Sequence, residues 1–143
     1  MFVTLAVLVI NRFNGEAHYV SAGHNPPALG VGGVDFAFVS PPSGIPLGIE
    51  ESARYEAARL ALAEDDVLVL YTDGVTEAMN AEKELFAEPR LLDCLNDGPA
   101  TSSSELAARL TDSVAQFSRG APQSDDMTLV IVRRGLGDAA GGE

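Results

Sequence analysis

VLVLYTDGVTEAMN, residues 67–80, is the stretch on which the predicted fold depends. It begins as an apolar run without polar alternation, which is typical of a central strand covered on both faces. The run ends in Asp73 and Gly74, and the chain then becomes polar. An aspartate directly after a buried strand lies at the rim of a sheet, where it can reach solvent and ions. We therefore expect the rest of the chain to support a carboxylate at this rim.

Length and composition indicate one globular, acidic domain. The chain has 143 residues, of which 46% are hydrophobic, and a formal net charge of −12. Such a charge repels nucleic-acid phosphates and anionic lipids, so we expect neither nucleic-acid nor membrane binding. Cys94 is the single cysteine, which excludes an intrachain disulfide and fits a cytoplasmic protein. The opening MFVTLAVLVI is too short to span a membrane, which takes about 20 residues, and predicts a strand.

β-branched and apolar runs separated by turn residues predict a series of strands, of which the first two form an antiparallel pair. Asn14-Gly15 is a strong signal for a two-residue hairpin between the first two runs. The segment ARYEAARLAL is read as a strand, with a short helix as the alternative. The loop from Pro41 to Gly48 is rich in helix and strand breakers, and its Ile45 and Leu47 are expected to pack down. The expected strands are residues 2–10, 16–22, 28–31, 34–39, 54–61, 67–72 and 127–132.

Two helices are predicted between Asp73 and the last strand. The first has Pro89 at its first position and ends before Gly98. The second begins with a capping box, and its apolar residues recur at intervals of three and four, which indicates one buried face. Its pattern consists of Ser102 and Glu105, then Leu106, Leu110, Val114 and Phe117. Residues 1–134 are therefore expected to form the domain, and residues 135–143 a disordered tail.

Acidic residues mark the edges of two of the predicted strands. Asp73 follows one strand, and Asp125 and Asp126 precede another. If these strands are antiparallel neighbours, the three carboxylates meet at the same rim. Oxygen ligands without a Cys or His cluster favour Mg²⁺ or Mn²⁺ over Zn²⁺. The alternative is that these residues serve only as turn formers, since Asp and Gly are favoured in turns.

Other chemistries find less support in the sequence. A haloacid-dehalogenase-type phosphatase needs an aspartate two residues before Asp73, and that residue is Tyr71. There is no Walker A or dinucleotide-binding glycine pattern and no Gly-x-Ser-x-Gly turn. His18 falls inside a strand and is interpreted as structural. His24, between Gly23 and an Asn-Pro-Pro kink, is the candidate catalytic histidine, with hydrogen bonding within its loop as the alternative.

The order of the motifs carries a family resemblance. Five motifs follow one another from Met1 to about Arg134: MFVTL, YVSAGHNPP, GIPLGI, VLVLYTDGVTEAMN and QSDDMTLVIV. In this order they resemble the metal-dependent protein serine/threonine phosphatases of the type 2C superfamily, and specifically their bacterial SpoIIE/RsbU branch. The resemblance implies an α+β fold, an antiparallel β-sandwich flanked by helices.

The resemblance also implies a site. Asp73 and Asp125 would be metal-ligand aspartates, Asp126 would support them, and His24 would lie at the edge of the site. Two Mn²⁺ or Mg²⁺ ions would activate a water for attack on phosphorus, without a phosphoenzyme. The implied substrate is a protein phosphorylated on serine or threonine, such as an anti-sigma-factor antagonist in a partner-switching pathway.

One family motif has no counterpart here. The family carries Gly-Asp-x-x-Gly-His-Gly, with a further metal aspartate, upstream of the segment that resembles MFVTL. We therefore expect this chain to be the C-terminal part of a catalytic domain, without the N-terminal strands and first helix pair. The rival hypothesis is a non-catalytic module that binds a partner protein through exposed sheet surface or the loop from Pro41 to Gly48.

Overall fold

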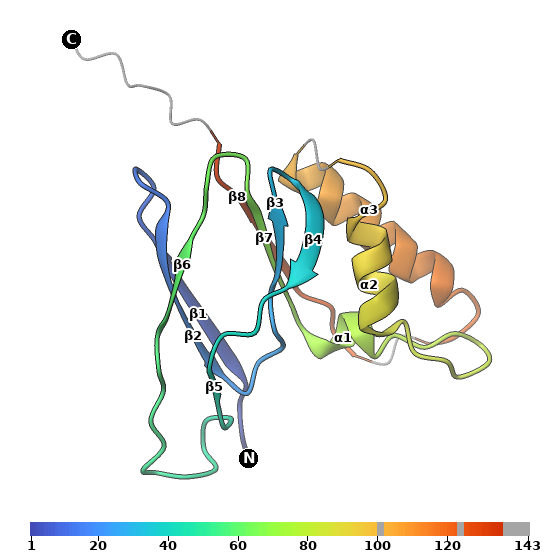
Figure 1. The fold of residues 1–143 in the computed structure, drawn as a ribbon. Coiled ribbons are helices and arrows are strands. Elements are labelled where there is room, and N and C mark those ends of the chain that lie inside the picture. The colour runs from blue at the N-terminus through green and yellow to red at the C-terminus, as the bar shows by residue number, and fades with distance from the viewer. Residues whose placement is uncertain (100–101, 123–124, 136–143) are drawn as a thin grey trace.

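The computed structural model describes residues 1–99, 102–122 and 125–135, and they form three layers (Figure 1). A first four-stranded sheet lies against a second four-stranded sheet, and two helices cover the outer face of the second. The predicted α+β class with antiparallel sheets is confirmed. The predicted tail lies outside the described residues apart from Gly135.

The first sheet is built on strand β2 (Glu16–Ala22). It pairs antiparallel with β1 (Leu5–Ile10) on one side and with β6 (Ala58–Ala61) on the other. A two-residue strand, β5 (Ser43–Gly44), continues the β6 side and runs parallel to β2. β1 is therefore an edge strand, and its exposed residues alternate with half-buried ones.

The second sheet has the order β4-β3-β7-β8, and all its pairs are antiparallel. The strands are β3 (Ala28–Val31), β4 (Val34–Phe38), β7 (Val67–Tyr71) and β8 (Leu129–Arg133). Four of the five residues of β7 are buried, as predicted for a central strand. Leu68 is buried on the face opposite Val67 and Val69, since side chains alternate along a strand.

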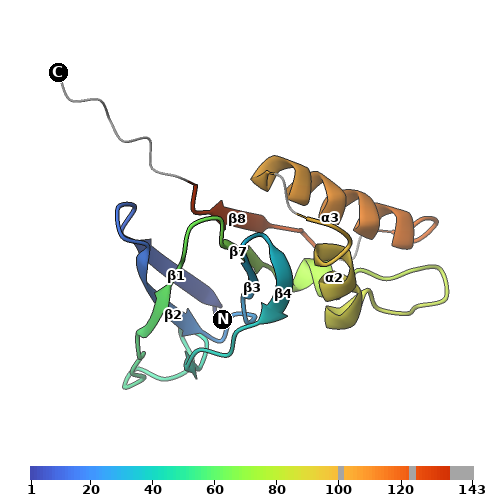
Figure 2. The ribbon, with the colours of Figure 1, turned by 45° about the horizontal axis from the view of Figure 1, so that its top comes forward.

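Three helices follow β7, although two were predicted. α1 (Asp73–Thr76) is a single turn, and α2 (Ala87–Leu95) and α3 (Ser103–Phe117) lie side by side on the sheet (Figures 1 and 2). The predicted capping box of α3 is confirmed, because the Ser102 side chain accepts a hydrogen bond from the Glu105 N–H at 3.1 Å. Pro89 is the third residue of α2 rather than its first.

The main core lies between the second sheet and the helices. It contains buried residues of both layers, among them Val67, Val69, Tyr71, Phe86, Leu91, Leu95, Leu106, Leu110 and Val114. Tyr19 and Leu62, fully buried residues of the first sheet and its flank, lie outside this cluster. None of the helices within the described residues is long and apolar enough to cross a membrane.

Hydrogen bonds of Asp66 and Arg134 stabilise the end of the sandwich where β7 begins and β8 ends. The buried Asp66 carboxylate accepts hydrogen bonds from the N–H groups of Gly32 and Ala63, both at 2.8 Å. The Arg134 guanidinium donates to the carbonyls of Leu62 at 2.7 Å and Phe13 at 3.2 Å. These bonds join loops of both sheets and leave the opposite end, with Asp73, for the candidate site.

The hairpin between β1 and β2 was predicted in the right place but with the wrong turn. Residues 11–15 connect the strands, and Gly15 alone among them has a positive φ, of 77°. The Asn11 side chain accepts the N–H of Phe13 at 3.0 Å, and the Gly15 N–H donates to the Asn11 carbonyl at 2.8 Å. Asn11 therefore organises a longer loop that the Asn14-Gly15 pattern did not reveal.

Several predicted strands are shorter in the structure. The first begins at Leu5, because Leu5 pairs with Ala22 at the end of β2, and Val3 forms an isolated bridge to Leu47. The strand predicted over residues 54–61 is confirmed only from Ala58, and those over 34–39 and 127–132 became Val34–Phe38 and Leu129–Arg133. Ile45, expected to pack down, is 40% exposed.

The N-cap of α3 provides a test of the local fold. Replacing Ser102 with Ala removes the acceptor for the Glu105 N–H, and we expect the free energy of unfolding to fall by about 1 kcal/mol. Ser104→Ala, inside the same helix and exposed, is the matched control and should change stability little. Urea unfolding followed by circular dichroism measures both, and an equal loss in the two variants would contradict the assignment.

Candidate metal-binding edge

The pairing of β7 with β8 brings the two acidic segments together. The strands are antiparallel neighbours, with Tyr71 opposite Leu129, so the residues after Tyr71 meet those before Leu129. Thr72 links them through three hydrogen bonds. Its N–H donates to the Thr128 carbonyl at 3.1 Å, and its hydroxyl accepts from the Thr128 N–H at 2.9 Å and donates to the Asp126 carbonyl at 3.2 Å. The two strands are therefore antiparallel neighbours, which is the arrangement that the sequence analysis required for the acidic segments to share one edge.

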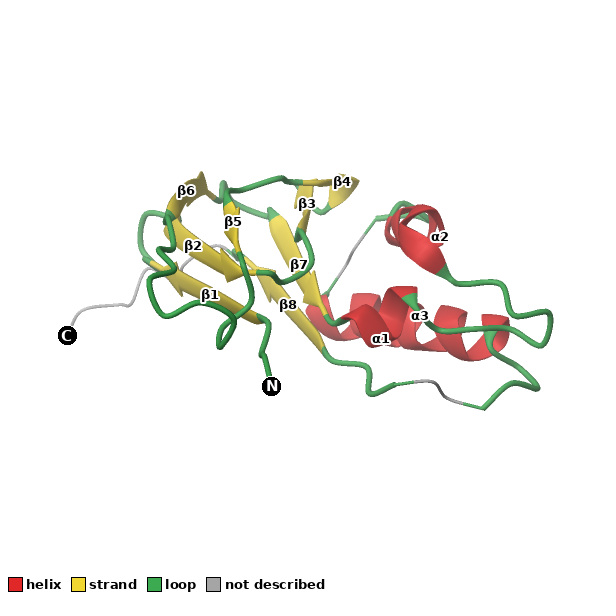
Figure 3. Ribbon diagram, turned by 90° about the horizontal axis from the view of Figure 1, so that it is seen from below, coloured by secondary structure: helices red, strands yellow, loops and turns green. Residues whose placement is uncertain are grey.

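Gly74 brings α1 against the second acidic segment. A Cβ atom at Gly74 would lie 2.4 Å from the Asp126 carbonyl oxygen, a distance that real Cβ atoms do not tolerate. Only a residue without a side chain allows this approach of backbone to backbone. The first turn of α1, which begins at Asp73, therefore packs directly on the Asp125-Asp126 backbone. Figure 3 shows α1 at the end of β7, near the segment that leads into β8.

The three aspartates lie at the surface of this edge. Asp73, Asp125 and Asp126 are all exposed. Asp125 Oδ1 accepts a hydrogen bond from the Asp126 N–H at 2.7 Å, which fixes that carboxylate against its own backbone. The donor set consists of carboxylate oxygens and suits a hard divalent cation. Within residues 1–99, 102–122 and 125–135, however, no three His, Cys, Asp or Glu side chains are gathered closely enough to hold a metal. The aspartates thus fit part of a ligand set.

His24 lies in the loop that leads into β3. Antiparallel pairing of Ala28 with Val69 runs the residues before Ala28 toward the end of β7 where Asp73 lies. The His24 N–H donates to the Ser21 hydroxyl at 3.2 Å, and its Nδ1 lies 3.5 Å from the Thr4 hydroxyl. The bond to Ser21 is the hydrogen bonding within the loop that was considered as the alternative to catalysis, and the contact with Thr4 links the imidazole to the segment before β1. No described hydrogen bond or ion pair joins His24 to the three aspartates.

Two tyrosines lie buried in the two sheets. Tyr19 in β2 and Tyr71 at the end of β7 are 0% and 2% exposed. Burial is the main cause that raises the pKa of both phenols above the usual value. Both hydroxyls therefore stay protonated at neutral pH.

Sequence reasoning singled out the carboxylates and missed what positions them. Thr72 and Gly74 flank Asp73. The Thr72 hydroxyl donates to the Asp126 carbonyl, and a side chain at position 74 would collide with that carbonyl. The signal was present in the Thr-Asp-Gly triplet, in which the threonine ends the strand and the glycine follows the aspartate. The role of Thr72 and Gly74 depends on the pairing of β7 with β8, which the local sequence does not predict.

Comparison with known proteins gives a family match over most of the chain. The sequence model of the family described as Stage II sporulation protein E (SpoIIE) matches residues 1–135. Among curated proteins, IcfG of Synechocystis sp. (strain ATCC 27184 / PCC 6803 / Kazusa) is 30% identical over 94% of this chain and 21% of its own length. The phosphoserine phosphatase RsbU of Bacillus subtilis (strain 168) is 28% identical over 94% of this chain and 39% of its own length.

Solved structures show the same fold. The SiaA-PP2C domain of Pseudomonas aeruginosa superposes with a TM-score of 0.78 at 19% identity, over 91% of this chain and 51% of that one. The manganese-presoaked phosphatase domain of the cell fate determinant SpoIIE from Bacillus subtilis gives a TM-score of 0.71 at 20% identity, over 93% and 57%. This chain thus spans less than two fifths of these curated relatives and a little over half of the solved domains.

The close approach at Gly74 provides a test of how the edge is assembled. Ala is normally more stable than Gly inside a helix by up to about 1 kcal/mol. We expect the opposite for Gly74→Ala, a loss of about 1 to 3 kcal/mol, because the new methyl group meets the Asp126 carbonyl. Gly135→Ala, with nothing around it, is the control and should be neutral. Thermal and urea unfolding measure both, and a stabilised Gly74→Ala variant would exclude the described packing.

Proposed function

Because this chain belongs to the SpoIIE family of type 2C phosphatase domains, we propose that it is part of a metal-dependent protein serine/threonine phosphatase. The observation that carries the proposal is the meeting of Asp73 with the Asp125-Asp126 segment at one end of a buried sheet. The two acidic segments lie far apart in sequence and are joined by Thr72 and Gly74. If these aspartates served only to form turns, there would be no reason for the two segments to lie at the same edge.

Asp73 and Asp125 are the residues that would hold a divalent cation, and Asp126 supports them. The structurally similar phosphatase domain of SpoIIE from Bacillus subtilis was presoaked with manganese. Manganese is a metal that suits the oxygen donors of this edge. When bound, Mn²⁺ or Mg²⁺ supplies an activated water and offsets negative charge on a phosphoryl group. The strand end, α1 and the Thr72 hydrogen bonds keep the carboxylates of this chain at the edge. His24 would flank the same site.

The proposed substrate is a protein phosphorylated on serine or threonine, in the manner of an anti-sigma-factor antagonist. Support comes from the relative RsbU, whose name is phosphoserine phosphatase. The three aspartates are exposed at this edge, where a phosphorylated side chain on a protein surface can reach them. The expected cytoplasmic location accords with such a substrate.

Substitution of the metal-binding candidates tests the proposed activity. We expect Asp73→Asn and Asp125→Asn each to lower Mn²⁺-dependent hydrolysis of p-nitrophenyl phosphate by about 100-fold or more, because loss of even an outer partner of a metal ligand costs about 10- to 100-fold. Hydrolysis is measured for residues 1–143 and for a longer protein that also contains any residues encoded in frame upstream of Met1. Exposed Glu56→Gln is the control. Full activity in both aspartate variants would refute the assignment.

A second candidate function, a non-catalytic partner-binding module, is favoured by the surface of β1. Leu5, Val7 and Val9 lie on one face of this edge strand and are 43%, 42% and 62% exposed. The strand carries no charged residue, and exposed apolar edge strands tend to pair with another chain. Such a surface serves a binding module as well as a phosphatase domain that is completed by further sequence.

Metal binding by the chain distinguishes the two functions. A competent site should take up Mn²⁺ in isothermal calorimetry, and the heat should be lost in the Asp73→Asn variant. Glu56→Gln should titrate like the unchanged protein. Absence of Mn²⁺ binding by residues 1–143, with or without upstream sequence, would favour the binding module.

A further inference from the structure

An uncharged groove lies along one face of α3, beside the acidic edge. Two adjoining hollows form it, with volumes of about 240 and 220 Å³, and both are lined by Val114 and Met127. Gly74 of α1 and Met79 line the first hollow on one side, and Ala115 of α3 lines it on the other. None of the described residues that line either hollow is charged, although the chain has a net charge of −12. We call this surface the α3 groove.

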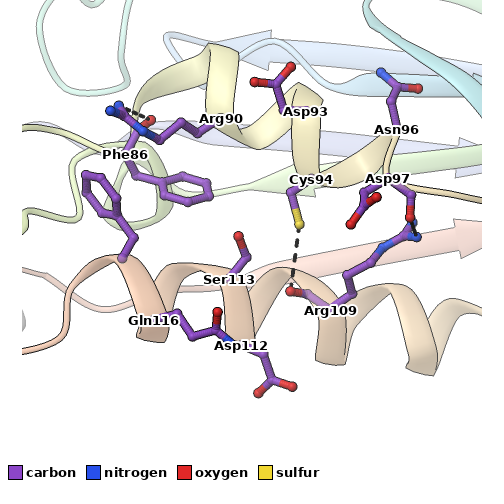
Figure 4. Close-up of a pocket in the computed structure, with 11 residues that line it drawn as sticks. Phe86, Arg90, Asp93, Cys94, Asn96, Asp97, Arg109, Asp112, Ser113 and Gln116 are labelled. Carbon is purple, nitrogen blue, oxygen red and sulfur yellow. Dashed lines mark hydrogen bonds between the residues drawn. The ribbon is translucent and has the colours of Figure 1, made fainter.

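The helix that forms one wall of the α3 groove is held in place by α2. The lining residues of this helix and its C-cap recur every three or four positions, as on one helix face: Ala107, Leu110, Thr111, Val114, Ala115 and Ser118. A different face packs on α2, where the Cys94 thiol donates to the Arg109 carbonyl at 3.7 Å (Figure 4). The Phe86 ring also meets the Phe117 ring edge to face, at a centroid distance of 5.4 Å. These contacts position the wall without a ligand.

The first hollow of the α3 groove has an accessible apolar lining. Met79 is 38% exposed and Met127 is 36% exposed. Ala115 is also exposed, whereas Val114 is buried. An apolar cavity of about 150 Å³ is large enough to bind benzene. The hollow of about 240 Å³ can therefore receive one side chain of the size of leucine, and flexible methionines adapt their shape to such a ligand.

The α3 groove is continuous with the acidic edge. Gly74 directly follows Asp73, and Met127 directly follows Asp126. Consecutive Cα atoms are about 3.8 Å apart, so the wall of the first hollow begins one residue away from each aspartate. An extended peptide advances about 3.3 Å per residue. A side chain within about three residues of a phosphorylated residue at the edge therefore reaches the first hollow.

Resting on the proposed phosphatase function, we propose that the α3 groove binds an apolar side chain of the phosphoprotein substrate. That side chain lies within about three residues of the phosphorylated serine or threonine and contacts Met79, Ala115 and Met127. The acidic edge then selects the phosphoryl group, and the groove selects the residue beside it. A hydrophobic pocket distinguishes ligands that differ by one methylene group by about 10- to 200-fold, so the groove would contribute to the choice of substrate.

The test uses methionine methyl signals, because the chain has three methionines and two of them line the groove. Residues 1–143 are labelled with ¹³C at the methionine methyl groups, and Met1, which does not line the groove, is the internal control. Mg²⁺ is the added metal, because paramagnetic Mn²⁺ would broaden the signals.

Four peptides of about 10 residues separate the two parts of the proposed substrate. The central residue is either serine or the non-hydrolysable phosphonate analogue of phosphoserine, and the residues two and three positions away on each side are either leucine or serine. The leucine phosphonate peptide should shift the Met79 and Met127 signals but not that of Met1. The serine phosphonate peptide and the leucine peptide without phosphonate should each bind at least about tenfold more weakly.

A matched pair of variants tests the groove itself. Ala115→Phe fills the first hollow, and we expect the preference for leucine over serine to fall from at least about tenfold to within about twofold. Ala108→Phe places the same side chain at another exposed position of α3, outside both hollows, and should keep the preference. Circular dichroism confirms that both variants are folded, and Met79→Gln gives a milder second variant that should also lower the preference.

The outcomes distinguish the groove from the phosphatase function. Equal affinity of the leucine and serine phosphonate peptides, or shifts that spare Met79 and Met127, would overturn the role of the groove and leave the phosphatase function standing. Leucine-dependent binding that is equal with and without the phosphonate would show that no phosphoryl group is recognised, and would contradict the phosphatase function as well as a substrate role for the groove. Absence of binding by all four peptides would also overturn the proposal.

Discussion

The antiparallel pairing of β7 with β8 is the constraint on which the rest of the structure depends. It places a buried strand at the centre of the second sheet and aligns Tyr71 with Leu129. The helices then cover one face of that strand and the first sheet lies on the other. The same register ends both strands at one edge, so the residues after Tyr71 and before Leu129 have to share it.

At that edge the packing is between backbones rather than between side chains. Thr72 uses both its N–H and its hydroxyl to hold residues 126 and 128, and Gly74 removes the one Cβ that would separate α1 from Asp126. The carboxylates therefore lie at the surface, while contacts with Thr72 and Gly74 hold the backbone of Asp126. If this edge holds a cation, as proposed, its ligands would be positioned before the ion is bound.

The sequence by itself determined most of the strands, the buried central strand, the capped helix from Ser103 and the acidic residues at two strand ends. These features follow from local patterns: apolar runs, a capping box and turn residues that act over a few positions. It did not determine the five-residue hairpin loop at Asn11, the turn of α1 or the exposure of Ile45, because each depends on contacts outside its own segment. Only the tertiary structure decided which strands are neighbours, and hence that Gly74 has to be a glycine and that Asp73 shares its edge with Asp125 and Asp126. Strand pairing is a long-range choice, and a strand sequence records the face that it buries but not the partner beside it.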